Sequence, residues 1–207
     1  MAADASFEGG THSSSPPIGP GLVVLVVGPS GAGKDAVIRE VRDRLAHDTR
    51  FVFPRRIVTR EASGAEDHAS TTPADFEARL RQGAFALHWQ AHGLHYGIPA
   101  QIDDAVRCGS TILFNASRHA APPARSRYSN AAVVIIDAPL EVRAARLAAR
   151  GREHGEEIAS RLVRLVPGFS TADADFVIDN TGTVARAADL LVAWLRARHS
   201  HLAAPPA

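Results

Sequence analysis

The glycine-rich stretch that decides the fold reads Gly28-Pro29-Ser30-Gly31-Ala32-Gly33-Lys34-Asp35. It matches the pattern G-x-x-x-x-G-K and directly joins an apolar run, Leu22–Val27, to a helical pattern over residues 36–46. Glycines let the backbone curl so that successive N–H groups point inward at phosphate oxygens, and the next helix adds the positive end of its dipole. The stretch therefore predicts a loop, residues 28–35, that binds the phosphates of a nucleotide.

Lys34 is the only lysine of the chain, because the other 22 of its 23 basic residues are arginines. Lysine is a compact, flexible point charge, and it is not interchangeable with arginine where space is tight. In a loop of this type the lysine reaches the β- and γ-phosphates. A single lysine kept at this position favours a working phosphate-binding loop.

Asp35 stands where serine or threonine usually ligates Mg²⁺. A carboxylate is also a hard oxygen donor, so we expect Asp35 to be a metal ligand. The apolar run Thr111–Asn115, a candidate for the strand that supplies a supporting acid, ends in Asn115 instead of aspartate. We hypothesise that the negative charge has moved from the end of that strand to the loop. The alternative is that Asp35 only caps the helix.

The composition bounds the class of protein. The 207 residues suffice for one domain with a lid or small insert, and 23 Lys+Arg against 22 Asp+Glu argue against a sequence-independent nucleic-acid partner. The single cysteine, Cys108, excludes an internal disulfide framework and favours the cytoplasm. No apolar run approaches the ~20 residues of a membrane span, and no secretory signal is recognised, so no membrane partner is expected.

Short apolar runs alternate with helical patterns, which is typical of an α/β fold around a parallel sheet. Strands are expected at Leu22–Val27, Thr111–Asn115, Ala132–Ile136 and Phe176–Ile178, and a last helix over Thr183–Arg198 with Leu190, Leu191, Trp194 and Leu195 on its apolar side. The fold class is thus a three-layer α/β/α domain over residues 21–198. A disordered tail, residues 1–20, precedes it, and a flexible tail, residues 199–207, follows it.

The less regular region 51–99 is interpreted as an insert that carries its own helix. Thr72 is the expected N-cap of that helix, with Pro73 in the first turn. The helix is expected to run to about Gln82, and Gly83 is a plausible stop.

Three elements of the insert carry a family resemblance: Arg55–Arg60, Glu66-Asp67-His68 and Gly93–Gly97. In this order they resemble the acceptor pocket of guanylate kinases, and the resemblance extends from Gly21 to about Arg198. The departures point to a relative of that family. The loop ends in Lys-Asp, Asp67 replaces a tyrosine, and residues 115–118 read N-A-S-R. With Ile57–Ser63 and His92–Gly97, these features resemble the ribose 1,5-bisphosphate phosphokinases, which are associated with bacterial phosphonate breakdown.

The resemblance implies a reaction in which ATP and ribose 1,5-bisphosphate give ADP and phosphoribosyl diphosphate, with Mg²⁺ as the metal. The nucleotide would be bound by residues 28–35, with Asn180 in the loop that contacts adenine. The acceptor, a phosphorylated sugar, would be bound by Arg56, Thr59, Arg60, Glu66, His68, Tyr96, Asn115, Ser117 and Arg118. Arginine forks suit bidentate phosphate binding, although a solvated basic patch is the alternative for Arg56 and Arg60.

An arginine-rich lid is expected at about residues 150–161. Arg143, Arg146 and Arg150 share one face of a helix at spacings of i, i+3 and i+7, with Leu140 and Leu147 on its buried side. A closing lid would bring positive charge over the transferring phosphoryl group and exclude water.

The catalytic residues expected from this lid are Arg150 and Arg161, with Arg146 next, beside Lys34 of the loop. The alternative for each arginine is a solvated helix face. No general base is needed, because a phosphate acceptor is already anionic near neutral pH.

Two other functions stay open at this point. A guanylate kinase would need side chains for a guanine edge, and a non-catalytic guanylate-kinase-like module would lack a working phosphate loop. His88, His92 and His95 lie close together without the spacing of a zinc site. The sequence does not fix the oligomeric state, and a homodimer is compatible with it.

Overall fold

The computed structural model describes residues 16–60, 68–91, 93–149 and 171–203. Its centre is a five-stranded sheet with the order β2-β7-β1-β8-β9, in which every neighbouring pair is parallel. The strands span, in that order, Phe51–Val52, Thr111–Asn115, Leu22–Val27, Ala131–Asp137 and Phe176–Asp179. The four strands expected from the sequence are confirmed to within one residue at each end, while the short edge strand β2 was not predicted.

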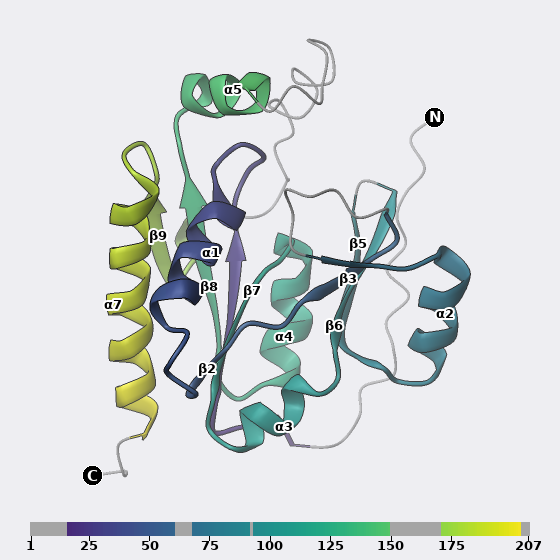
Figure 1. The fold of residues 1–207 in the computed structure, drawn as a ribbon. Helices are drawn as coiled ribbons and strands as arrows, with labels where there is room; N and C mark the ends of the chain where they lie inside the picture. Colours follow the sequence, from purple (N-terminus) through teal and green to yellow (C-terminus); the bar gives the residue numbers. More distant parts are fainter. Residues whose placement is uncertain (1–15, 61–67, 92, 150–170, 204–207) are drawn as a thin grey trace.

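Both faces of β1 are buried, which explains why its sequence is apolar without alternation. Val23, Leu25 and Val27 contribute to one hydrophobic cluster and Leu22, Val24 and Val26 to the other. The first cluster is covered by α3 (Ile102–Arg107) and α4 (Ala121–Arg127), and the second by α1 (Lys34–Arg44) and α7 (Val184–Ala203). This is the expected three-layer α/β/α arrangement (Figure 1).

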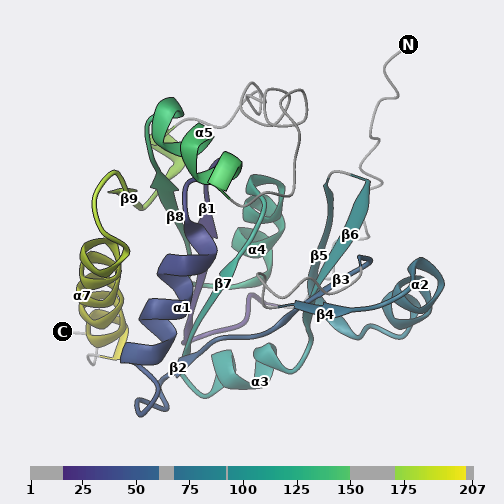
Figure 2. The same ribbon diagram turned by 45° about the horizontal axis from the view of Figure 1, so that its top comes forward.

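The insert forms a second sheet with the order β4-β3-β6-β5, which lies to one side of the core (Figure 2). Its strands span, in that order, His68–Ser70, Arg56–Val58, Leu94–Pro99 and Phe85–Ala91. We call it the acceptor sheet. The sequence predicted only the helix of this region, α2 (Pro73–Arg81), whose N-cap is confirmed: the Thr72 hydroxyl oxygen accepts a hydrogen bond of 3.1 Å from the Asp75 amide.

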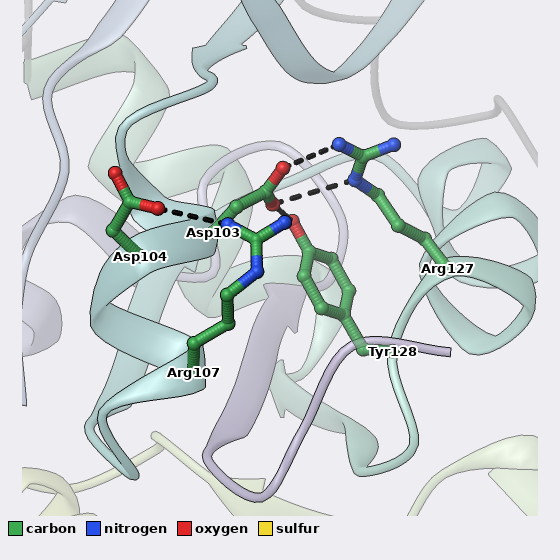
Figure 3. A network of polar contacts seen from close by, with 5 residues as sticks. All are labelled: Asp103, Asp104, Arg107, Arg127 and Tyr128. Carbon is green, nitrogen blue, oxygen red and sulfur yellow. Dashed lines mark hydrogen bonds and ion pairs between the residues drawn. The ribbon is translucent and has the colours of Figure 1, made fainter. Parts of the chain in front are cut away.

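A buried carboxylate holds α3, which follows the acceptor sheet in the chain, to α4 of the core (Figure 3). Asp103 accepts hydrogen bonds from the Arg127 guanidinium group and, at 2.7 Å, from the Tyr128 hydroxyl. Burial and the bond to Asp103 raise the pKa of Tyr128, so this hydroxyl stays protonated and remains a donor. The link fixes the end of the acceptor sheet relative to the parallel sheet.

The C-terminal helix is longer than expected and ends at Ala203 instead of Arg198. Its last turns pack against the parallel sheet. The ring centroids of His199 and Phe51 are 5.5 Å apart, and Nδ1 of His199 is 2.9 Å from the Thr111 hydroxyl. Residues 199–203 are therefore helix and not tail.

Two expectations about surface and core were wrong in detail. Leu190 and Leu140 were expected on buried sides, and they are 44% and 50% exposed. The N-terminal tail was expected to reach residue 20, yet Ile18 forms a bridge with Tyr128. No helix within the described ranges is long and apolar enough to cross a membrane.

A further helix, α5 (Leu140–Ala149), follows β8 and lies beside the glycine-rich loop, and two short 3-10 turns, η1 (Arg118–Ala120) and η2 (Thr171–Asp173), complete the described elements. The predicted lid, residues 150–161, lies outside the described residues.

Candidate active site

The loop of residues 28–35 has the curled backbone that the glycines predict. Gly33 is the N-cap of α1 in a left-handed conformation, with φ of 89°. The ammonium group of Lys34 turns back over the loop and donates to the carbonyls of Gly28, at 2.8 Å, and Pro29, at 3.0 Å. The ammonium group of Lys34 thus lies over the first residues of the loop. There it can exchange the two carbonyls for phosphate oxygens.

Two of the glycines are required by close packing as well as by conformation. A Cβ on Gly28, where φ is 147°, would lie 2.0 Å from the carbonyl oxygen of Ile136. A Cβ on Gly33 would lie 2.5 Å from Nδ2 of Asn180. The loop is therefore seated tightly on β8 and on the segment after β9.

Asn180 supports this loop from behind. Its side chain is 1% exposed, and its Nδ2 donates to the carbonyl of Ala32 at 2.7 Å. Its backbone amide donates to Asp137 at 2.7 Å, so the residue joins the loop to the ends of two strands. The expected contact of Asn180 with adenine stays a prediction.

Two arginines of α5 are bound to backbone carbonyls and are not part of a solvated face. Arg146 donates to the carbonyl of Asn180 at 2.8 Å and, more weakly, to that of Ala32 at 3.4 Å. Arg143 donates to the carbonyl of Ala138 at 3.0 Å. The helix that precedes the predicted lid, α5, is therefore in contact with the phosphate-binding loop through Arg146.

Asp35, Asn115 and Arg56 meet, although they are far apart in the chain. Asn115 ends β7 and donates its Nδ2 to Oδ1 of Asp35 at 2.7 Å. The Arg56 guanidinium group lies 3.6 Å from the same oxygen. Strand ends of a parallel sheet meet at one edge, which explains the contact between the strand end and the loop. The pairing gives Asp35 contacts beyond those of a helix cap.

Three of the nine residues expected to bind the acceptor lie on one face of the acceptor sheet. Arg56 pairs with His68 in the register of β3 and β4, and Val58 pairs with Tyr96 in that of β3 and β6. Because side chains alternate along a strand, Arg56, His68 and Tyr96 lie on one face, opposite Ile57. His68 is fully buried, and among the described residues neither of its ring nitrogens has a hydrogen-bond partner. Buried polar atoms are normally hydrogen-bonded, so His68 stays a candidate for contact with a ligand.

Thr59 and Ser117, which are also expected to bind the acceptor, make hydrogen bonds within the protein. The Thr59 hydroxyl accepts a hydrogen bond of 2.9 Å from the His95 amide and so fixes β3 against β6. Ser117 caps η1, in which Arg118 is the first residue. Arg60 follows β3 by two residues and is partly buried. Three expected site residues, Glu66, Arg150 and Arg161, lie outside the described residues.

Sequence reasoning did not single out Arg39 and Arg42, which line a cavity of about 50 Å³ beside Asp35. The sequence does carry a signal for them, because they follow Asp35 by four and seven residues and so lie on the same face of α1.

Comparisons with known proteins identify the fold and the family. No protein-family model matches the chain. The structure of guanylate kinase from Anaplasma phagocytophilum superimposes with a TM-score of 0.64 at 20% identity, covering 88% of this chain and 87% of that one. The chain thus has a P-loop fold of the guanylate-kinase type.

The curated relatives make the assignment sharper. Ribose 1,5-bisphosphate phosphokinase PhnN of Rhodopseudomonas palustris is 52% identical over 175 residues, 84% of this chain and 88% of that protein. The protein of the same name from Methylobacterium radiotolerans is 47% identical over 178 residues, 86% of this chain and 99% of that protein. The chain belongs to the family of ribose 1,5-bisphosphate phosphokinases.

Proposed function

We propose that this protein transfers the γ-phosphoryl group of ATP to the 1-phosphate of ribose 1,5-bisphosphate. An oxygen of that phosphate forms a bond to the γ-phosphorus, the bond from the γ-phosphorus to the β–γ bridging oxygen breaks, and ADP and 5-phosphoribosyl 1-diphosphate result. The observation that carries the proposal is the membership in this kinase family together with an intact phosphate-binding loop. Phosphonate catabolism is the setting that the membership implies.

The nucleotide phosphates would be held by the backbone of residues 28–35 and by Lys34. The acceptor would lie on the face of the acceptor sheet that carries Arg56 and Tyr96, with His68 offering a ring nitrogen. An acceptor phosphate is anionic near neutral pH, so no base has to remove a proton. Catalysis then consists of alignment, neutralisation of charge and exclusion of water.

The residues around Asp35 fit a Mg²⁺ ion. The carboxylate of Asp35 and the side-chain carbonyl of Asn115 are hard oxygen donors, and they lie together at the end of the loop. Asp35 would hold the ion, and Asn115 would orient the carboxylate. When bound, Mg²⁺ supplies positive charge to the β- and γ-phosphates.

The lid arginines complete the proposal. Arg146 already contacts the loop, and Arg150 and Arg161 would approach the transferring group from the lid. Positive charge at this position stabilises the negative charge of the transition state.

A panel of acceptors tests the proposal. We expect turnover of ribose 1,5-bisphosphate with ATP to exceed turnover of GMP, and the product to be identified by a coupled assay. Greater turnover of GMP would make the protein a guanylate kinase. A non-catalytic module would bind no ATP in a calorimetric titration, whereas the retained glycines and Lys34 support binding.

A further inference from the structure

The face of α1 that carries Asp35 continues with two arginines. Arg39 and Arg42 are spaced from Asp35 so that the three side chains follow one another along the helix. Side chains of an α-helix lean toward its N-terminus. The two guanidinium groups therefore lean toward the end of α1 that bears the phosphate-binding loop.

A cavity of about 50 Å³ lies against this face. Its other walls are the end of β7, residues 113–115, and the linker Phe53-Pro54 that leads from β2 to the acceptor sheet. Arg56 closes the side toward the acceptor sheet. Three of the lining residues are arginines, and the single carboxylate, that of Asp35, contacts Asn115 and, at 3.6 Å, Arg56.

The proposed acceptor makes a demand that the phosphate-binding loop does not meet. It carries two phosphate groups on one ribose, and only the one at position 1 reacts. The group at position 5 stays on the other side of the sugar ring, away from Lys34. Its binding needs a second set of cations next to the acceptor sheet but outside the loop.

We propose that the cavity lined by Arg39, Arg42 and Arg56 is the subsite for the non-reacting phosphate of a bisphosphate acceptor. This inference rests on the proposed function. Guanidinium forks match phosphate oxygens in a bidentate geometry, and the apolar wall of Phe53 and Ile38 strengthens each charge–charge contact by excluding water. Arg56 belongs to both the cavity and the acceptor face, so it connects the two ends of one ligand.

The subsite makes the enzyme select for the second phosphate. An acceptor that lacks the phosphate at position 5 leaves the arginine cavity unfilled and loses its contacts. A hydrogen bond to a charged group contributes enough that loss of one arginine should weaken binding roughly 10- to 100-fold. The same substitution should change the binding of an acceptor that lacks the phosphate at position 5 only little.

The test uses two ligands that each carry one of the phosphates. Binding of ribose 5-phosphate and of ribose 1-phosphate is measured by calorimetry on the full chain, for the wild type, Arg42→Gln and Arg39→Gln. Arg44→Gln is the matched control, because it removes the same charge from the same helix at a residue paired with Glu40 and Asp189. Thermal unfolding checks that each variant is folded, and Arg42→Lys serves if a glutamine variant is not.

We expect Arg42→Gln or Arg39→Gln to weaken ribose 5-phosphate roughly 10- to 100-fold and ribose 1-phosphate less than about threefold. The KM for ribose 1,5-bisphosphate should rise by about the same factor as the Kd for ribose 5-phosphate. Unchanged binding of ribose 5-phosphate, equal losses for both ligands, or no binding of ribose 5-phosphate to the wild type would overturn the subsite. Failure of the proposed function looks different, since the wild type would then not turn over ribose 1,5-bisphosphate.

Discussion

Replacing Asp35 by alanine tests the metal site most directly. The carboxylate oxygen that the change removes accepts a 2.7 Å hydrogen bond from Asn115 and lies 3.6 Å from the Arg56 guanidinium group. A hydrogen bond to a charged group contributes about 1.5–3 kcal/mol, and a partly exposed ion pair about 1 kcal/mol or less. The cost to folding is therefore a few kcal/mol at most, below the stability of an ordinary domain, so the variant should be folded.

The effect on metal binding is expected to be larger than the effect on the nucleotide. Outer partners of metal ligands alone change metal affinity about 10- to 100-fold, and Asp35 is proposed as a ligand. Asp35→Ala should therefore need at least about 10- to 100-fold more Mg²⁺ for half-maximal activity. The affinity for ATP without metal should change little, because the loop amides and Lys34 remain.

The assay has two arms. Calorimetry with ATP in the presence of a chelator measures the affinity of the loop for ATP without metal. The Mg²⁺ dependence of kcat/KM measures the apparent affinity of the site for the metal. Asn115→Ala is the control that keeps the carboxylate and removes only its hydrogen-bond donor, and it should show the smaller loss. The paired change Asp35→Ser with Asn115→Asp returns the carboxylate to the strand end and should recover part of the Mg²⁺ dependence.

Equal losses in the two arms would refute the reasoning. Asp35 would then act on the loop as a whole, for instance as a cap of α1, and the metal would be held by other groups.

The remaining predictions concern the loop, the fold and pH. Lys34→Ala should reduce turnover about 100-fold or more, and unchanged steady-state turnover would remove the basis of the proposed function. Asp103→Ala should lower the free energy of unfolding by about 2–4 kcal/mol in urea titrations, because Arg127 and Tyr128 lose a buried acceptor; a change below 0.5 kcal/mol would contradict this. Burial, followed by the nearby charge of Arg50, lowers the pKa of His199 below 6.5, so the folded state binds its proton less readily than the unfolded state. The free energy of unfolding should therefore be highest above pH 6.5 with respect to His199 and should fall as the pH drops toward the lowered pKa. His199→Gln should reduce this dependence on pH, and an unchanged dependence of the free energy of unfolding between pH 7.5 and 5 would argue against it.

The parts of the fold that were predicted correctly depend on local signals. Leu22–Val27 is apolar without alternation, and the glycines that follow allow only a tight turn into a helix. The Thr72 cap is likewise a matter of neighbouring residues. Such features need no knowledge of distant partners.

The acceptor sheet was not predicted because its signals are short and its pairing is not local. β3 and β4 have three residues each, and β4 consists of His68, Ala69 and Ser70, which are not strong strand formers. They become strands by pairing with each other and, through β3, with β6. The face shared by Arg56 and His68 follows from that register and cannot be read from either segment alone.

The site was predicted as residue types but not as contacts. Asp35 and Asn115 were related only by the hypothesis that the negative charge has moved from one to the other, and their hydrogen bond follows from the parallel neighbours β1 and β7 ending at one edge. Asn180 was placed in the loop that contacts adenine, which stays a prediction, and the hydrogen bond from its buried amide to the phosphate-binding loop was not foreseen. The end of α7 was missed because residues 198–201, Arg-His-Ser-His, are polar, although His199 reaches Thr111.

The presence of one lysine, placed at the mouth of the loop, gives the molecule a natural reporter. Besides the α-amine at the start of the chain, Lys34 carries the single primary amine available to acylating reagents. A label on this nitrogen would block the nucleotide, and bound nucleotide would shield the nitrogen from the label. Occupancy of the binding site could thus be followed by mass spectrometry as the acylation of one atom, without any engineered tag.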